Sequence, residues 1–166
     1  MNRRYLALLF IPLMLLFCGC NENKEPKPRL TVEEYVEAMD NAWSQYRDEG
    51  YGVFIQIALE VENDFYKMRE RKAEILEACD RMDAAMEKIK EINPPAEYQY
   101  LHEKLTASIE DEKRWNEYRR KGFSAETEED ADEYFDKISE ETDAMDSNES
   151  FPHIYLEIHM KYNGVE

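Results

Sequence analysis

The chain has 166 residues, a length that suits one domain of ordinary size rather than several modules. Its 38 acidic residues outnumber the 21 lysines and arginines, which gives a net charge of −17. A surface this acidic repels nucleic acid and anionic lipid headgroups, so we expect no nucleic-acid partner.

Residues 1–20 differ from everything that follows them. Two arginines precede the apolar run 5–17, and the sequence Cys-Gly-Cys closes the segment. A helix that crosses a membrane needs about 20 apolar residues, and this run is shorter. A basic start, an apolar stretch and small residues are typical of a secretory signal peptide, which we expect at 1–20.

The end of this segment resembles the lipobox of bacterial prolipoproteins, in which leucine-rich residues lead into a small residue and then the cysteine that receives lipid. Cys20 stands at the position of the lipidated cysteine. The residues before it are Leu15, Leu16, Phe17, Cys18 and Gly19, with Phe17 where leucine is usual and Cys18 where alanine or serine is usual. The resemblance implies a protein exported to the extracytoplasmic face of the cell membrane and anchored there through lipid on Cys20. An uncleaved hydrophobic anchor and a soluble secreted protein are the alternatives.

A polar segment with two prolines follows at 21–30, and we expect it to act as a tether because it has almost no apolar surface to bury. The folded domain is expected to span 31–166. Because Cys18 leaves with the signal and Cys20 is acylated, Cys79 has no partner for an internal disulfide. Packing alone must then hold the domain together.

The helical pattern begins at Thr31. Thr31 and Glu34 have the spacing of a capping box, so we expect a helix to start here, and we expect Gly50 and Gly52 to end it. Its apolar residues recur at steps of three and four, as one face of a helix requires. They are Val32, Tyr35, Val36, Met39, Trp43 and Tyr46.

The strongest periodic signal runs from 53 to 92 and predicts one long helix. Unbroken, it would be longer than any neighbour, so we expect it either to kink or to be covered by two shorter helices. Lys72 is the one polar residue of the series, and we interpret Cys79 as a small apolar member of the core. The sequence Asn-Pro-Pro at 93–95 then stops the helix and predicts a tight hairpin. The apolar series is Phe54, Ile57, Val61, Phe65, Met68, Ile75, Cys79, Met82, Met86 and Ile89.

Further helices complete the predicted fold. One helix is expected over 96–121, and Gly122 ends it. Another helix starts at Ser124, and the acids in its first turn complement the helix dipole. The last segment, 151–166, fits either a strand or a helix, and a serine cap and an early proline favour the helix. The whole pattern predicts an all-α, antiparallel helical bundle of four to five helices with one long central helix, after the signal and lipid-anchor segment.

No residue pattern in the sequence points to catalysis or to metal binding. The motifs of zinc proteases, dithiol sites, serine hydrolases and phosphate-binding loops do not occur. His102, His153 and His159 lack the Glu-x-x-His spacing of di-iron bundles. The acid runs 126–136 and 143–149 lack the EF-hand pattern and are interpreted as solvated helix faces. We therefore expect no enzyme and no catalytic residue, cofactor or metal.

Taken whole, the chain resembles the uncharacterised small helical-bundle lipoproteins of bacteria, particularly of low-GC Gram-positive species. The lipobox, the polar tether and the turn and helix opening at 94–105 carry this resemblance, which implies a fold and a location but no activity. We expect a non-enzymatic protein-interaction module or envelope accessory. The alternative is a solute- or ion-binding lipoprotein, which would need a pocket with converging polar groups, whereas an interaction module would show an exposed apolar or aromatic patch.

Overall fold

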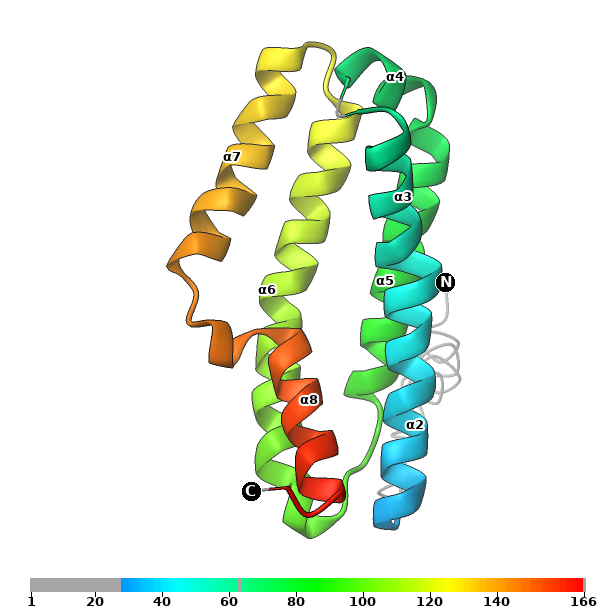
Figure 1. Cartoon of the computed structure of the whole chain (residues 1–166), viewed down its shortest axis with the longest axis vertical. Helices are drawn as coiled ribbons and strands as arrows, with labels where there is room; N and C mark the ends of the chain where they lie inside the picture. The colour runs from blue at the N-terminus through cyan, green and yellow to red at the C-terminus, as the bar shows by residue number, and fades with distance from the viewer. Residues whose placement is uncertain (1–27, 63, 166) are drawn as a thin grey trace, which may run out of the picture.

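The structure, a computed structural model, describes residues 28–62 and 64–165. Throughout these ranges the regular elements are helices packed against one another, which confirms the all-α bundle (Figure 1). The predicted signal peptide, Cys20 and most of the predicted tether lie outside the described residues. The elements are α2 (Val32–Ser44), η1 (Gln45–Tyr51), α3 (Gly52–Glu60), α4 (Phe65–Glu70), α5 (Lys72–Lys90), η2 (Ala96–Tyr98), α6 (Gln99–Ser124), α7 (Glu128–Ala144), η3 (Ser147–Glu149) and α8 (Phe151–Tyr162).

The first helix begins as predicted. The hydroxyl of Thr31 accepts from the backbone N–H of Glu34 at 3.3 Å, and the Glu34 carboxylate accepts from the N–H of Thr31 at 2.9 Å, so the capping box is confirmed. The glycines do not end the helix, which was the wrong part of the prediction. The chain passes through Gly50 in the π-helical turn η1 and continues directly into α3, so α2, η1 and α3 form one rod.

Close packing explains why a glycine occupies η1. A Cβ atom at Gly50 would lie 2.5 Å from Cγ of Met82 and 3.3 Å from the carbonyl oxygen of Ala78, both on α5. The glycine thus lets the first rod lie against α5 with almost no space between the backbones. Its role is close approach between helices rather than helix termination.

The single helix predicted over 53–92 is instead a hairpin. α3 ends at Glu60, Glu62 adopts a positive φ of 54°, and Asp64 caps α4 by accepting from the N–H groups of Tyr66 and Lys67. α5 then runs back along the first rod. Val61, Phe65 and Met68 are all buried, so the apolar steps of three and four continue across the turn. This period alone could therefore not reveal the reversal.

The rest of the chain follows the prediction more closely. The hairpin after α5 is confirmed, and α6 is the longest helix of the described chain with 26 residues. It continues through the buried Gly122 to Ser124, and Thr127 rather than Ser124 caps α7, where acids fill the first turn as expected. The last segment is the helix α8, with Phe151, Ile154 and Ile158 buried.

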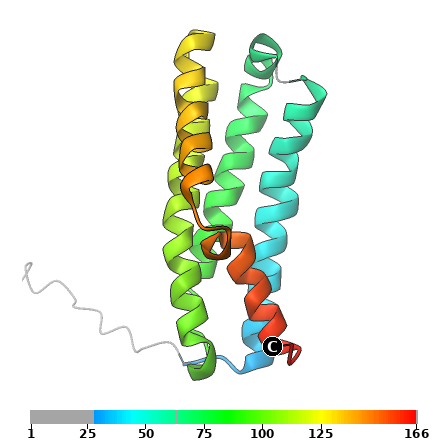
Figure 2. The ribbon, with the colours of Figure 1, turned by 60° about the vertical axis from the view of Figure 1, so that its left-hand side comes forward.

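The two ends of the bundle differ. Figures 1 and 2 show the start of α2, the hairpin between α5 and α6 and the end of α8 at one end, which we call the proximal end. α4 and the turn between α6 and α7 lie at the other, the distal end. α8 packs against α6 and α2 in the proximal half, and α7 packs along α6 in the distal half. Among the described residues no helix is long and apolar enough to cross a membrane.

Candidate functional site

An apolar cleft of about 320 Å³ opens at the distal end between α3, α4, α6 and α7. We call it the distal groove. It is lined by Phe54, Ala58, Phe65, Met68, Phe123, Glu128, Asp132 and Phe135. Six of these side chains are apolar and the two polar ones are acids of α7, so the cleft has an apolar floor and one charged edge.

A row of three phenylalanine rings spans the floor of the groove. The ring of Phe123 on α6 lies 5.7 Å from that of Phe54 on α3 and 5.0 Å from that of Phe135 on α7, both centroid to centroid. A Cβ atom at Gly122 would lie 2.7 Å from the Phe135 ring, so this glycine lets α7 settle onto α6. Phe54 and Phe135 remain only half-buried, which leaves apolar surface open to a partner.

Two large side chains next in sequence to groove residues are strongly exposed. Leu59 follows Ala58 on α3 and is 73 % exposed. Tyr66 on α4 is 69 % exposed, and its ring lies 5.4 Å from the ring of Phe65, which lines the groove. Both residues follow a lining residue in the chain, Ala58 and Phe65, but neither lines the groove itself.

The acidic edge belongs to a wider acidic surface. Glu128 and Asp132 also line a neighbouring open hollow of about 740 Å³, together with Glu129, Glu133 and Asp136. All five side chains are exposed, as expected for a solvated helix face. Glu133 is paired with Lys137 at 2.6 Å, and Lys137 is the one basic residue of α7. The α7 side of the groove is therefore strongly negative.

A buried polar cluster lies behind the groove. Arg119 and Glu112 on α6 form an ion pair at 3.0 Å, and both are buried. Burial by itself would lower the pKa of Arg119, but the Glu112 carboxylate and its other neighbours leave it raised. The guanidinium lies 5.6 Å from the ring centroid of Phe54, so it also contacts the floor of the groove.

Asn116 joins this cluster to α5. Its Nδ2 donates to the carbonyl oxygen of Cys79 at 2.9 Å and to Oδ1 of Asp83 at 2.7 Å, while its Oδ1 is buried without a hydrogen-bond partner in the described chain. Cys79 itself is fully buried, and burial raises the pKa of its thiol to about 11. The interpretation of Cys79 as a core residue is confirmed.

The sequence contained a signal for this cluster that the apolar pattern did not capture. Leu105 and Ile109 are apolar core residues of α6, and Glu112, Asn116 and Arg119 continue the same steps of three and four. A helix face that changes from apolar to polar while keeping its period indicates either a helix that leaves the core or a buried polar network. Here the face stays buried, so these residues form a buried polar network.

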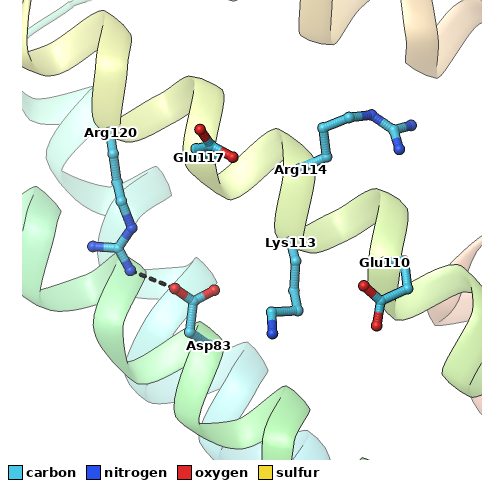
Figure 3. A pocket seen from close by; sticks show the side chains of 6 residues that line it. All are labelled: Asp83, Glu110, Lys113, Arg114, Glu117 and Arg120. Carbon is cyan, nitrogen blue, oxygen red and sulfur yellow. Dashed lines mark hydrogen bonds and ion pairs between the residues drawn. The ribbon is translucent and has the colours of Figure 1, made fainter.

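A different hollow, of about 490 Å³, lies on the outer side of α6 and is lined almost entirely by charged groups (Figure 3). Arg120 pairs with Asp83 at 2.6 Å, Glu110 pairs with Lys90 at 2.6 Å, and Lys113 pairs with Glu87. Each of these charges already has a partner, although Lys90 and Glu87 do not themselves line the hollow. Its lining residues are Asp83, Glu110, Lys113, Arg114, Glu117 and Arg120.

The three histidines lie apart. His102 is buried, and its Nδ1 lies 3.3 Å from the hydroxyl of Tyr35. His159 lies 2.6 Å from a carboxylate oxygen of Asp40, which also accepts from Tyr155 at 2.7 Å. Across the described residues no group of three or more His, Cys, Asp or Glu side chains is placed to hold a metal ion.

No family model, no curated protein and no solved structure matches this chain. The functional assignment therefore depends on the residues themselves. Cys20 lies outside the described residues, so its lipidation stays a prediction.

Proposed function

We propose that this protein is an exported lipoprotein, anchored to the cell membrane through lipid on Cys20, whose helical bundle binds another protein at the extracytoplasmic face and catalyses no reaction. The observation that carries this proposal is the distal groove, with its floor of phenylalanine side chains. The residues that follow Ala58 and Phe65 of its lining, Leu59 and Tyr66, are strongly exposed at the same end of the bundle. Aromatic and large apolar side chains around a shallow apolar cleft are typical of the centre of a protein interface.

The position of the groove suits a tethered module. The described chain enters the bundle at the proximal end, where the backbone N–H of Leu30 donates to the carbonyl oxygen of Asn93 at 3.1 Å. The residues between Cys20 and Pro28 could span at most about 30 Å when fully extended. A lipid on Cys20 would thus hold the proximal end near the membrane and present the groove away from it (Figure 1).

The groove favours a protein partner over a small solute. Solute sites combine an enclosed cleft with several converging polar groups. In the distal groove the polar groups, Glu128 and Asp132, stand together on one edge. The hollow in Figure 3 has many charges, but Arg120 and Asp83 pair with each other there. Its Glu110 and Lys113 pair with Lys90 and Glu87 beside it.

The anchor is tested by metabolic labelling with palmitate and membrane fractionation of the wild-type chain and of Cys20→Ala. We expect the variant to lose both label and membrane association. Cys79→Ala is the matched control, because this buried thiol should take no lipid. Unchanged labelling of Cys20→Ala would overturn the anchor.

The interaction role is tested by site-specific photocrosslinking in cells, with benzoylphenylalanine placed at Leu59 or at Tyr100. Tyr100 is 71 % exposed, about as much as Leu59, but lies at the start of α6, at the proximal end. We expect a discrete adduct from position 59 that disappears when Ala58→Arg fills the groove, and none from position 100. Equal adducts from both positions, or an adduct at 59 that survives Ala58→Arg, would contradict the proposal.

A further inference from the structure

We propose that the distal groove receives an amphipathic helix of the partner protein, with large apolar side chains on one face and lysines or arginines along its flank. This inference rests on the proposed function, since it specifies the partner of the same groove. It follows from three features of the described residues. These are the apolar floor of the groove, the distal helix surface that α8 does not cover, and the negative charge of the α7 edge.

The floor fits apolar side chains that project from a helix. Phe54, Phe123 and Phe135 form a connected row across three helices. Met68 adds a flexible thioether at the α4 side, and such side chains adapt to irregular apolar partners. A helix that presents residues at i, i+3, i+4 and i+7 would place them along such a floor.

One helix of the chain, α8, already packs in the proximal half on the side of the bundle where the groove lies in the distal half. In the proximal half α8 lies across α2 and α6 (Figures 1 and 2). Its residues Phe151, Ile154 and Ile158 are buried. In the distal half the corresponding surface, between α3 and α6 with α7 at its edge, is the groove. An added helix there would cover the half-buried Phe54 and Phe135 as α8 covers the proximal core.

The charge of the α7 edge specifies a basic partner. Glu128, Glu129, Asp132 and Asp136 are exposed acids on this edge, and α7 supplies Lys137 alone as a base. Lysines or arginines on the flank of the incoming helix would meet these carboxylates, which raises the association rate and fixes the orientation. A second copy of this chain is disfavoured, because two molecules with a net charge of −17 repel each other.

The test uses the full chain reconstituted in vesicles of zwitterionic phosphatidylcholine, so that the lipid itself attracts little basic peptide. The probe is a fluorescent 18-residue peptide designed as a Leu/Lys amphipathic helix, and binding is followed by anisotropy. One control peptide has the same composition in scrambled order, and another carries glutamate in place of every lysine. Empty vesicles give the lipid background.

The protein variants separate charge from shape. Glu128→Lys/Asp132→Lys reverses the two acids that line the groove, and Glu140→Lys/Asp143→Lys makes the same change of charge elsewhere on α7. Ala58→Trp fills the apolar cleft without changing charge. We expect the first double variant and Ala58→Trp each to weaken binding by about tenfold or more, and the control double variant to weaken it by about twofold at most.

The outcomes distinguish the partner chemistry from the proposed function. Preference for the Leu/Lys helix over both control peptides, lost in the groove variants, supports the inference. Equal binding of the glutamate peptide, equal effects of the two double variants, or self-association of the chain in place of peptide binding overturns it. If the peptide fails while the adduct at position 59 persists and depends on the groove, the basic-helix partner is wrong and the interaction module stands.

Discussion

A guanidinium nitrogen of Arg119 lies 3.0 Å from a carboxylate oxygen of Glu112 inside the bundle. The two residues are seven positions apart on the same face of α6. Neither side chain has more than a tenth of its surface exposed. A buried ion pair costs desolvation energy that its own attraction barely repays, so the pair adds little net stability but makes each partner dependent on the other. Glu112 also acts on Tyr46, since burial and then this nearby carboxylate raise the pKa of the Tyr46 hydroxyl.

Breaking this pair should cost much more than removing it. Arg119→Met leaves Glu112 buried without a cation, and we expect a loss of about 3–5 kcal/mol in the free energy of unfolding. Glu112→Leu/Arg119→Met should recover most of that loss, because no buried charge remains. Urea denaturation of the three chains measures both effects. A double variant no more stable than Arg119→Met would contradict this account of the pair.

Gly50→Ala should destabilise the protein although alanine is the better helix former. The gain in helix propensity is about 1 kcal/mol, but the added methyl group would meet Met82 at 2.5 Å and its backbone nitrogen at 3.1 Å. Overpacking of this kind costs about 1–3 kcal/mol, so we expect a net loss seen as a lower midpoint of thermal unfolding. Asn41→Ala, at an exposed position of α2, is the control and should be neutral or slightly stabilising. A stabilised Gly50→Ala would show that η1 can move away from α5.

His102 should make the protein less stable in weak acid. Burial lowers the pKa of His102, although Glu103 nearby acts in the opposite direction. Below the ordinary histidine pKa of about 6.5, the unfolded chain therefore takes up a proton that the folded chain still refuses. The contribution of His102 is complete above that pH and is lost as the pH falls.

The measurement is the change in unfolding free energy between pH 7.5 and pH 5.5. We expect a smaller loss in His102→Gln than in the wild-type chain, because glutamine does not titrate. Carboxylates titrate in all variants alike, so the comparison isolates the imidazole. His153→Gln, on the half-buried side of α8, serves as the control, and a His102→Gln chain that loses as much stability as the wild type would refute the prediction.

Glu141→Gln should loosen the C-terminal half of α7. The Glu141 carboxylate accepts from Nε of Arg114 at 2.8 Å, from Nε1 of Trp115 at 3.0 Å and from the hydroxyl of Tyr118 at 3.2 Å, all on α6. Burial by itself would raise the pKa of Glu141, but these donors outweigh it and leave the pKa lowered. Because the side chain is about one-third exposed, we expect the loss to be on the order of 1 kcal/mol.

Hydrogen exchange measures this loosening locally. Amides near Glu141 should exchange about fivefold faster in Glu141→Gln, while those of α5 should keep their protection. Glu140→Gln changes the same charge at the exposed neighbouring position and should leave the exchange of α7 unchanged. Uniform acceleration throughout the bundle would mean that α7 opens together with the whole domain rather than separately.

The helical class of this protein could be read from its sequence because local rules were decisive. Thr31 and Glu34 mark a helix start through side-chain hydrogen bonds that need no tertiary partner. Pro94 and Pro95 stop the helix before them, because proline cannot continue the backbone hydrogen bonding of a helix interior. The steps of three and four in α5 and α6 place one face of each helix in the core. Such signals act within one or two helical turns, so they can be read from the sequence without the tertiary structure.

Tertiary structure decided the features that depend on two segments at once. Gly50 was expected to end a helix, but its conformation is set by the close approach of α5, which no local pattern records. The turn that begins at Val61 stayed hidden because both arms of the hairpin bury residues at the same apolar period. The distal groove likewise exists only where Phe54, Phe123 and Phe135, from three helices, meet with one side uncovered. Hydrogen bonding along the chain determined where helices form, and packing between distant residues determined which surfaces remain open to bind.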